Sequence, residues 1–470
     1  MSGDGDLFVG IDLGTQSARV LVVGADATVA GRGAAPLRSR RDGDAHEQSP
    51  RGWWHAAAAA CRDALAGVAA ERVRALATCG TSGTIVLVDR DGEPVTEGLM
   101  YDDGRAAVQA RRLGMATSWA LPKLHWLLER ERAATRPGVR AAHQPDVVTR
   151  RLVGHAVASD ASHALKTGYD AQRACFADPG DADLRELLPD VVAPGTRLGE
   201  VCARAAAETG LPRGAAVIAG MTDGCAAQIA AGALRPGDCN SVLGTTLVLK
   251  GCAPQRIDDR ARGVYSHRSP DGDWLPGGAS SSGAGVLPAT FPKHDLDELG
   301  RRAAEHERTS VLAYPLVSRG ERFPFAAADA RAFVLGTPAG DGEHAAALMQ
   351  GVALVERLCF EQLAGLGAPV DGELSLTGGA TRNRAWCQLR ADALGRPARL
   401  PEQSESAFGM AILAAAATAG ELLAGAARRM SRTRAVVEPR ASLRAHLDEQ
   451  YDRLLGELVR RGWLAGAADR

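Results

Sequence analysis

The sequence lacks several features that would each indicate a different class of protein. No apolar run approaches the roughly 20 residues of a membrane-spanning helix, and the alanine-rich run 56–60 is only a short helical segment. The acidic start, residues 1–6, has neither the basic region nor the cleavage site of a secretory signal. Basic and acidic residues nearly balance, 55 against 56, which disfavours nucleic acid or an acidic membrane as partner. We therefore expect a cytoplasmic protein with a small-molecule partner.

Cysteine pairs and several familiar motifs are also missing. The nine cysteines are odd in number and include no CxxC pair, which predicts reduced, structural cysteines rather than disulfides or zinc ligands. The sequence has no GxxxxGK[ST], which excludes a P-loop enzyme, and no GxGxxG after its first strand. No GxSxG surrounds Ser82, so a serine hydrolase is a poor interpretation.

The length of the chain predicts two domains. Its 470 residues exceed the roughly 250–300 residues at which a single hydrophobic core stops growing. A Pro-Gly turn at 234–237 ends a helical segment and precedes a second β-rich run, which favours a boundary there. We predict an N-terminal domain over residues 1–235 and a C-terminal domain over residues 236–470, without a low-complexity linker.

The pattern of apolar residues predicts mixed α/β structure in both halves. In the first half it predicts a helix over Trp53–Ala70 and strands over Leu7–Asp12, Ser17–Val23, Val73–Cys79 and Thr84–Val88. In the second half it predicts a hairpin over Cys239–Lys250, a strand over Glu373–Thr377, and helices over Leu348–Leu363, Arg384–Leu394 and Ala407–Ala424. The last helix is rich in small residues, which suit close packing.

Two aspartates stand at the ends of apolar strands. Asp12 ends the first strand, and Asp223 ends the apolar run that begins at Val217. A carboxylate in this position costs free energy unless it binds a metal, sugar hydroxyls or a hydrogen-bond network. A structural cap of the following helix remains an alternative for Asp223, and the two roles are compatible. Two such strand ends favour phosphoryl transfer, with a metal-bound phosphate beside a general base.

Turns of the same character recur in the two halves: Gly14, Thr15 and Gln16 in the first, and Gly244, Thr245 and Thr246 in the second. Glycine lets the main chain approach a phosphate, and the turn offers N–H groups and hydroxyls. One copy alone is more often an ordinary hairpin turn. Because the turn recurs, we predict an internally duplicated fold with two phosphate-binding turns.

Two further loops are candidates for binding. The segment Gly378-Gly379-Ala380 follows a strand and precedes Asn383 and a helix, so its bare backbone suits a flat base and the helix N-terminus suits phosphate. Alone it is also compatible with a plain strand-to-helix loop. The loop 102–105, with Asp103 and an arginine, suits a polyol held by paired hydrogen bonds. A solvated surface turn is an equally open interpretation of this loop.

Together these motifs resemble the FGGY family of carbohydrate kinases, which have the actin/hexokinase fold. The resemblance covers nearly the whole chain in the family's order: the first turn at 8–19, Glu-Gln and Trp-Trp at 47–54, the Gly-Thr-Ser run at 80–89, and most specifically 378–392. It implies an α/β fold of two actin-like (ribonuclease H-like) domains flanking a central cleft. It also implies phosphorylation of a sugar by ATP with Mg²⁺, the sugar held by the first domain and the nucleotide mainly by the second.

The resemblance implies a role for each matching residue. Asp223 corresponds to the general base, and Asp12 and Asp223 lie at the Mg²⁺ ion. The implied substrate contacts are Asp12, Ser82, Asp103 and Thr222. The implied phosphate and nucleotide contacts are Gly14, Thr15, Gln16, Gly244, Thr245, Thr246, Gly378, Gly379, Ala380 and Asn383.

The sequence departs from the family on the sugar side. Tyr101 stands where the family often has Trp, and Thr222 stands where glycine is frequent. The run Ser159–Asp170, with Met221 and Thr222, resembles the D-ribulose kinases more than standard xylulokinases. We therefore predict phosphorylation of D-ribulose at its primary hydroxyl, with a xylulokinase or another polyol kinase of this family as the alternative.

Two other classes of function remain open. One is a sugar- or nucleotide-sensing protein without catalysis, because a fold does not determine a function; the presence of Asp223 disfavours it. The other is an actin-like or chaperone ATPase without a sugar substrate, which stimulation of ADP release by a pentulose would argue against. We expect sugar and ATP as partners, no nucleic acid or membrane, and a monomer or homodimer.

Overall fold

The computed structural model describes residues 5–178 and 180–465. The chain forms two compact units. The first unit combines residues 1–232 with the segments 267–272 and 403–431, and the second combines 233–266, 273–402 and 432–470. The segment 403–431 thus lies beyond the predicted boundary near residue 235 but packs within the first unit. Each unit is therefore built from three separate segments of the chain, which one boundary in the sequence cannot describe.

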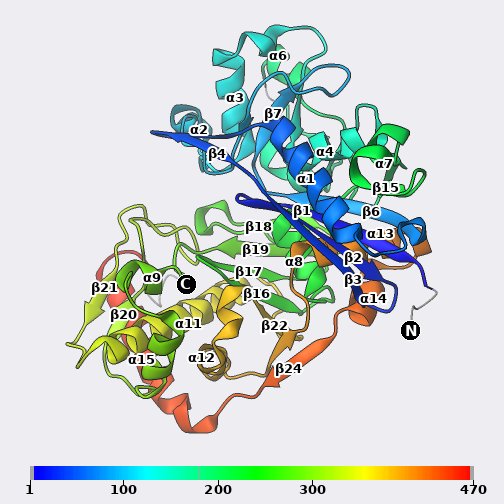
Figure 1. Cartoon of the computed structure of the whole chain (residues 1–470). Coiled ribbons are helices and arrows are strands. Elements are labelled where there is room, and N and C mark those ends of the chain that lie inside the picture. The colour runs from blue at the N-terminus through cyan, green and yellow to red at the C-terminus, as the bar shows by residue number, and fades with distance from the viewer. Residues whose placement is uncertain (1–4, 179, 466–470) are drawn as a thin grey trace. The chain divides into compact units, whose positions relative to one another are not determined.

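The main sheet of the first unit, in its described residues, has six strands in the order β14-β15-β6-β1-β2-β3 (Figure 1). Strands β1, β6 and β15 run parallel, and β2 and β3 continue from β1 as an antiparallel meander. The strands are β1 (Leu7–Leu13), β2 (Ser17–Gly24), β3 (Val29–Pro36), β6 (Val73–Gly80), β14 (Arg197–Glu200) and β15 (Ala216–Ile218).

A second sheet of this unit has the strand order β4-β5-β8-β7-β9. Strand β7 follows β6 after the Gly80–Gly83 turn, yet it pairs with β8 and β9. The two strands predicted around this turn therefore exist but lie in different sheets. The strands outside the main sheet are β4 (Ser39–Asp42), β5 (Ala45–Gln48), β7 (Ile85–Val88), β8 (Gly98–Leu99), β9 (Arg140–His143), β10 (Ser159–Asp160), β11 (Tyr169–Asp170), β12 (Cys175–Phe176) and β13 (Val191–Val192).

The helices of the first unit include one pair that covers both faces of the main sheet, α1 and α13. Strand side chains alternate between faces, and the pairing register places Gly10 on one face and Gly33 on the other. A Cβ at Gly10 would lie 1.7 Å from the carbonyl oxygen of Ala407 in α13, and one at Gly33 would lie 2.0 Å from that of Ala60 in α1. Glycine therefore lets each helix approach the sheet backbone. The helices are α1 (Pro50–Leu65), α2 (Ala107–Leu113), α3 (Ala120–Arg130), α4 (Gln144–Val153), α5 (Ala161–Ala164), α6 (Ala182–Leu187), α7 (Ala203–Thr209), α8 (Asp223–Ala230), α13 (Ser406–Ala419) and α14 (Leu423–Met430).

Two helix ends differ from the prediction. Helix α1 starts earlier than expected, at Pro50, where proline suits the first turn. It ends at Leu65 rather than continuing to residue 70, and Gly67 takes a left-handed φ of 79°. The helix predicted over 407–424 is two helices, because α13 ends at the left-handed Gly420 and α14 begins at Leu423.

The second unit repeats the topology of the first. Its described seven-stranded sheet has the order β18-β19-β17-β16-β22-β23-β24, in which β16 pairs antiparallel with β17 and parallel with β22. This matches β1 between β2 and β6, so the predicted duplication is confirmed. The strands are β16 (Cys239–Leu243), β17 (Leu247–Gly251), β18 (Tyr265–Arg268), β19 (Trp274–Ala279), β20 (Leu312–Tyr314), β21 (Phe333–Leu335), β22 (Leu374–Thr377), β23 (Ala398–Pro401) and β24 (Thr433–Val437).

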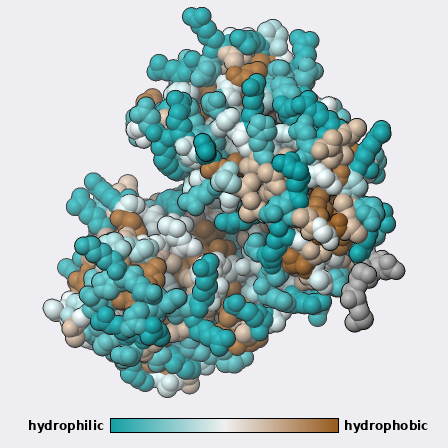
Figure 2. All heavy atoms as spheres, in the orientation of Figure 1, coloured by the Kyte–Doolittle hydropathy of each residue, from teal (hydrophilic) through white to brown (hydrophobic). Residues whose placement is uncertain are grey.

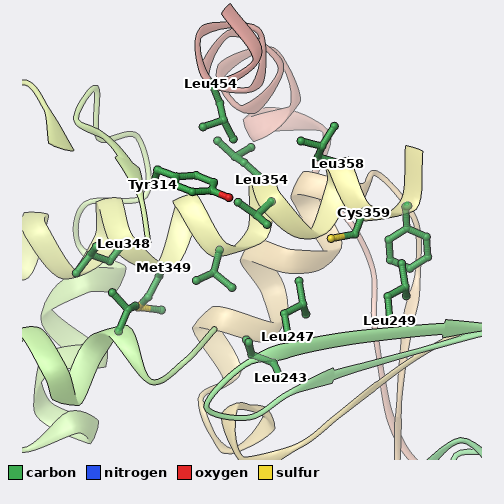
Figure 3. Packing of buried hydrophobic residues seen from close by; sticks show 14 of the residues in the cluster. Leu243, Leu247, Leu249, Tyr314, Leu348, Met349, Leu354, Leu358, Cys359 and Leu454 are labelled. Atoms are coloured by element: carbon green, nitrogen blue, oxygen red, sulfur yellow. The ribbon is translucent and has the colours of Figure 1, made fainter. Parts of the chain in front are cut away.

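The core of the second unit lies between its sheet and a long helix, α11. Figure 3 shows Leu243, Leu247 and Leu249 pointing from the β16–β17 hairpin towards Leu354 and Leu358 of this helix. All these side chains are almost fully buried, so the hairpin is anchored by hydrophobic packing. The helices of this unit are α9 (Val286–Thr290), α10 (Leu296–Ala304), α11 (Asp341–Gly365), α12 (Arg384–Leu394) and α15 (Ala441–Arg460).

The face of the molecule drawn in Figure 2 is mostly polar. Figure 2 shows hydrophilic side chains over most of the face in view, with smaller hydrophobic patches. None of the helices in the described residues combines the length and apolar character required to cross a bilayer. The nine cysteines all lie in the described residues and form no disulfide, and seven of them are buried, Cys175 and Cys202 being the exceptions.

Candidate active site

The candidate residues of the first unit lie at one edge of its main sheet. In the parallel register Asp12 pairs with Cys79 and Leu13 with Gly80, and Gly80 forms a further parallel bridge with Thr222. The strand ends that carry Asp12, the turn after Gly80, and Asp223 are therefore adjacent. The carboxyl edge of parallel strands is where open α/β sheets usually bind ligands.

Asp12 is buried at this edge and lacks strong compensation for its charge. Its Oδ1 accepts a long hydrogen bond from the Cys79 thiol at 3.5 Å. Burial, followed by the charge of Asp223, raises the pKa of Asp12 to about 7, although Arg19 on β2 opposes the shift. A carboxyl held at such a pKa is typical of functional sites.

Asp223 is the first residue of helix α8, and Thr222 is the N-cap. The Oδ1 atom of Asp223 accepts a hydrogen bond from the Gly224 N–H at 2.8 Å, and the carbonyl oxygen of Asp223 accepts one from Ser406 Oγ at 3.1 Å. Asp223 is less buried than Asp12. The carboxylate thus contacts the start of the helix without being its N-cap, and it remains partly accessible.

The pair Asp12 and Asp223 fits a divalent cation in charge and chemistry. The charge of Asp223 raises the pKa of Asp12, and a bound cation would relieve this repulsion. Among the described residues, no group of three or more His, Cys, Asp or Glu side chains could hold a metal. Mg²⁺ commonly uses only one or two carboxylates, with waters and substrate phosphates as the other ligands. The Mg²⁺ role of the two residues remains a prediction.

The turn after β6 contains Ser82, whose hydroxyl is buried and has no hydrogen-bond partner in the described part of the chain. A buried hydroxyl without a partner costs free energy, which a ligand hydroxyl would recover. Three basic side chains contact carbonyl oxygens of the same turn. His163 Nε2 lies 3.2 Å from the Gly80 oxygen, Lys166 Nζ lies 3.1 Å from the Ser82 oxygen, and Lys123 Nζ lies 3.2 Å from the Gly83 oxygen. These three contacts hold the backbone of the turn that carries the unpartnered Ser82 hydroxyl.

Lys123 is a buried residue of this site that the sequence prediction missed. Its ammonium group also donates to the carbonyl oxygens of Tyr101, Thr117 and Trp119, at 2.9–3.2 Å. Burial, followed by the charge of Lys166, lowers the pKa of Lys123 to about 7. A lysine within the apolar run 120–128 was the available signal, because a charge on the apolar face of a helix requires partners.

The loop 101–105 differs from a solvated surface turn. Asp103 is fully buried, and its carboxylate accepts hydrogen bonds from the His46 N–H at 2.8 Å and from Arg105 Nη2 at 2.8 Å. Arg105 also pairs with Glu47 at 2.7 Å. Asp102 is more accessible and binds Arg41 at 2.8 Å. Direct sugar contact by Asp103 thus stays a prediction, and the structure shows that this carboxylate also holds the loop together.

The first Gly-Thr turn lies beside this loop. The Gly14 N–H donates to the Ser17 carbonyl oxygen at 3.1 Å, and the Thr15 carbonyl oxygen accepts from Gln48 Nε2 at 2.6 Å. Thr15 also hydrogen-bonds the Tyr101 phenol; burial and the charges of Asp102 and Asp223 nevertheless raise the pKa of Tyr101 above its ordinary value. Tyr101 therefore lies near both the turn and the candidate base. Gln16 is exposed, and its carbonyl oxygen accepts from the Leu37 N–H at 2.8 Å.

The nucleotide candidates of the second unit occupy the equivalent edge of its sheet. Strands β16 and β22 are parallel, with Val242 opposite Thr377, so the turn 244–246 and the segment 378–383 leave neighbouring strand ends. The carbonyl oxygens of Gly244 and Thr245 accept hydrogen bonds from the N–H groups of Ala284 and Gly285, at 2.9 and 3.1 Å. Segment 283–285 therefore supports the turn that is predicted to bind phosphate.

Glu321 holds the residues just before this supporting segment and was also missed by the sequence prediction. Its buried carboxylate accepts hydrogen bonds from Ser280 Oγ at 3.0 Å, the Ser281 N–H at 2.6 Å and the Tyr314 phenol at 2.7 Å. Residues 280 and 282 pair in turn with Leu247, which directly follows the Gly-Thr-Thr turn. Glu321 acts across a long sequence separation, so no local motif indicates it.

The second candidate nucleotide segment is tightly packed at its first residue and open at its second. Gly378 has a φ of 90°, and a Cβ there would lie 2.5 Å from the Leu243 carbonyl oxygen. A Cβ at Gly379 would meet nothing within 4 Å. Ala380 accepts the Asn383 N–H through its carbonyl oxygen at 3.1 Å, and Asn383 Oδ1 caps α12 by accepting from the Trp386 N–H at 3.0 Å. The nucleotide roles of these residues stay predictions.

Gly379→Val should raise the KM for ATP by about 10–100-fold, because the valine enters open space predicted to hold the nucleotide. The fold tolerates the new side chain, since no neighbour lies within 4 Å. The KM for the sugar should change little. Steady-state kinetics with each substrate varied in turn measures both values. Gly340→Val is the control, because Gly340 in the same unit is equally open, and its extended backbone accepts a side chain. An equal rise in both KM values would instead indicate general damage to the fold.

Comparison with known proteins identifies a family for both halves of the chain. Residues 7–230 match the N-terminal domain of the FGGY family of carbohydrate kinases, and residues 239–418 match its C-terminal domain. A xylulose kinase of Streptomyces coelicolor is 31% identical, with 91% of each chain covered. A xylulose kinase of Streptomyces rubiginosus is also 31% identical, with 97% of each covered.

Solved structures share the fold. A kinase from Brucella ovis, described as a xyloylose kinase, superposes with a TM-score of 0.88 at 24% identity and covers 97% of this chain and 99% of its own. The xylulose kinase of Rhodospirillum rubrum has a TM-score of 0.86 at 24% identity, with 97% and 98% covered. These likenesses confirm the predicted α/β class with two duplicated domains.

Proposed function

This chain belongs to the FGGY family of carbohydrate kinases, and we propose that it transfers the γ-phosphoryl group of ATP to the primary hydroxyl of a ketopentose. Family membership makes it an ATP-dependent sugar kinase. The choice of a ketopentose, with D-xylulose as first candidate, is supported by the two Streptomyces relatives, both of which are xylulose kinases. This support is stronger than that for D-ribulose, the substrate predicted from sequence.

In the proposed reaction Asp223 accepts the proton of the attacking hydroxyl. Its position supports this role, because the carboxylate is anchored by Gly224 yet only partly buried. Burial, followed by the charge of Asp223, raises the pKa of Asp12. A cation bound beside the two carboxylates would therefore favour their charged forms. When bound, Mg²⁺ would neutralise the phosphates, and Asp12 and Asp223 are the residues that would hold it.

The other groups of the first unit orient the sugar in this proposal. Ser82 Oγ is buried without a partner in the described residues and would hydrogen-bond one sugar hydroxyl. Tyr101 lies near Thr15 and Asp223 and would contact the face of the bound sugar. In the second unit, the turns 244–246 and 378–380 would hold the phosphates and the adenosine.

D-ribulose is a second candidate, favoured by the run Ser159–Asp170. This run resembles the D-ribulose kinases in sequence, and in the structure His163 and Lys166 bind the turn that carries Ser82. D-ribulose and D-xylulose differ only in the configuration at C3. A site that reads this hydroxyl leaves a buried polar group unpaired with the wrong epimer, at a cost of about 1–3 kcal/mol.

A coupled ADP-release assay with D-xylulose, D-ribulose, gluconate and glycerol tests the assignment. We expect kcat/KM for D-xylulose to exceed that for D-ribulose by about 5–150-fold, with gluconate and glycerol lower still. A preference for D-ribulose would support the second candidate. A preference for gluconate or glycerol would reject a ketopentose substrate, and ADP release at the same rate without any sugar would reject the kinase mechanism.

A further inference from the structure

The run Ser159–Asp170 contacts both strand ends that carry the candidate active site. It comprises β10, the short helix α5, a 3₁₀ turn over Leu165–Thr167 and the short strand β11. Helix α4, labelled in Figure 1, contributes Asp146, which binds Ser159 of this run. The proposed function uses the contacts of this run with the turn at residue 82. It leaves unexplained why the run also reaches the segment before Asp223.

Ser162 makes that second contact. Its Oγ accepts a hydrogen bond from the Thr222 N–H at 2.9 Å and donates one to Asp160 Oδ1 at 2.5 Å. Ser162 is 1% exposed and Thr222 is 1% exposed. Because its proton points to Asp160, a lone pair of the hydroxyl is oriented towards the Thr222 peptide. The partner is 60 residues away in sequence.

Asp160 is itself held in place from two sides. Its Oδ1 also accepts the N–H groups of Ser162 and His163, and its Oδ2 contacts His163 Nδ1 at 2.6 Å. Burial disfavours the charged form of both groups, but the attraction between them is the stronger effect. The pKa of Asp160 is therefore lowered by His163, and the pKa of His163 is raised by Asp160. The ion pair is completed by His163 Nε2 at the Gly80 carbonyl oxygen, 3.2 Å away.

These contacts link the ends of two neighbouring strands through hydrogen bonds. Gly80 ends β6, and Thr222 forms a parallel bridge with it. Ser162 binds Thr222 and His163 binds Gly80, and Asp160 holds both of these side chains. The peptide of Thr222 leads directly into the first helical residue, Asp223. The Ser162 hydrogen bond therefore acts on the backbone that sets the direction of the Asp223 side chain.

We infer that Ser162 is a positioning residue for phosphoryl transfer, which fixes the Thr222 peptide so that the Asp223 carboxylate meets the attacking sugar hydroxyl. This inference rests on the proposed role of Asp223 as general base. Small displacements of a reacting group lower the rate of the chemical step while binding is largely retained. Ser162 should therefore affect kcat far more than either KM.

Ser162→Ala should lower kcat about 10–100-fold with less than about a threefold change in the KM for ATP. Ser159→Ala is the matched control. Ser159 is also 1% exposed, lies in the same run and binds an aspartate, Asp146, but it contacts His143 rather than the segment before Asp223. It should keep kcat within about threefold of the original while losing a similar amount of unfolding free energy. Equal kcat losses in both variants would overturn the inference.

Ser162→Cys supplies a graded comparison, because a thiol retains a weaker donor and acceptor. Its kcat should lie between those of the original protein and Ser162→Ala, and it carries the test if the alanine variant does not fold. A Cys variant with unchanged kcat would overturn the inference.

A double-mutant cycle with Asp223→Asn separates this inference from the proposed function. If Ser162 acts through Asp223, adding Ser162→Ala to Asp223→Asn should lower the residual kcat by less than about threefold. A full further loss would show that Ser162 acts elsewhere and would overturn the inference. Normal kcat in Asp223→Asn alone would overturn the role of Asp223 and the inference together. A large loss in Asp223→Asn with none in Ser162→Ala would overturn only the inference.

Discussion

Asp223→Asn is expected to lower kcat by roughly 10²–10⁴-fold, the usual contribution of a positioned general base. An asparagine has nearly the same shape, and its Oδ1 can still accept the hydrogen bond from the Gly224 N–H that anchors the start of α8. The fold and the affinity for ATP should therefore persist. Steady-state kinetics at saturating sugar and ATP measures the loss, and thermal unfolding confirms that the variant is folded.

A second aspartate at a helix start provides the control for this result. Asp181 caps α6 by accepting the Asp183 and Leu184 N–H groups, at 2.9 and 3.3 Å, in the same unit but outside the candidate site. Asp181→Asn should change stability little, because aspartate and asparagine are comparable N-caps, and it should leave kcat unchanged. Near-normal kcat in Asp223→Asn would show that this residue has only a structural role at the start of α8.

Asp12→Asn should increase the stability of the ligand-free protein at pH 8, although it should abolish most activity. The pKa of Asp12 is raised to about 7 by burial and by Asp223, whereas an unfolded aspartate has a pKa of about 3.9. The folded state therefore binds the proton more tightly. The protonated Asp12 carboxyl contributes its full stability below about pH 4. This contribution falls as the pH rises towards about 7 and is lost above that pH. The loss reaches at most about 4 kcal/mol.

Urea unfolding of the original protein and Asp12→Asn at several pH values, with EDTA and without substrates, measures this effect. The variant should gain stability relative to the original protein between about pH 4 and 7, and the gain should level off above pH 7. Asp6→Asn is the control, because Asp6 precedes the same strand but is exposed and pairs with Arg74. It should show no such gain. A lower stability of Asp12→Asn than of the original protein at pH 8 would contradict a destabilising buried charge.

Local elements were largely predictable from the sequence because their signals are local. Strands β1 and β16 end in the predicted Gly-Thr turns, and helix α12 has the predicted bounds Arg384–Leu394. Turn residues, apolar periodicity and caps act within a few residues of each other. The same signals, repeated in both halves, were enough to predict the duplicated α/β fold. They also indicated the resemblance to the family whose domains match residues 7–230 and 239–418.

The bounds of some helices depended on single residues with weak signals. Gly67 and Gly420 both take left-handed φ values, 79° and 66°, yet glycine is also tolerated within a helix. The apolar pattern continues across both positions, so it predicts longer helices than the structure has. The sugar substrate was also not determined, because the run Ser159–Asp170 and the Streptomyces relatives support different epimers.

By itself, then, the sequence determined the α/β class, the duplication, the residues at the ends of the central strands and the kind of chemistry they suit, because each depends on neighbours along the chain. Only the tertiary structure decided which strands pair after the Gly80 turn, that segment 403–431 packs with the first unit, and that Asp103 is buried against Arg105. It also decided that Ser162 holds the Thr222 peptide and that Lys123 holds four carbonyl oxygens. These contacts depend on burial and on partners distant in sequence, and the free energy of a buried polar group is determined by the partners that surround it in the fold.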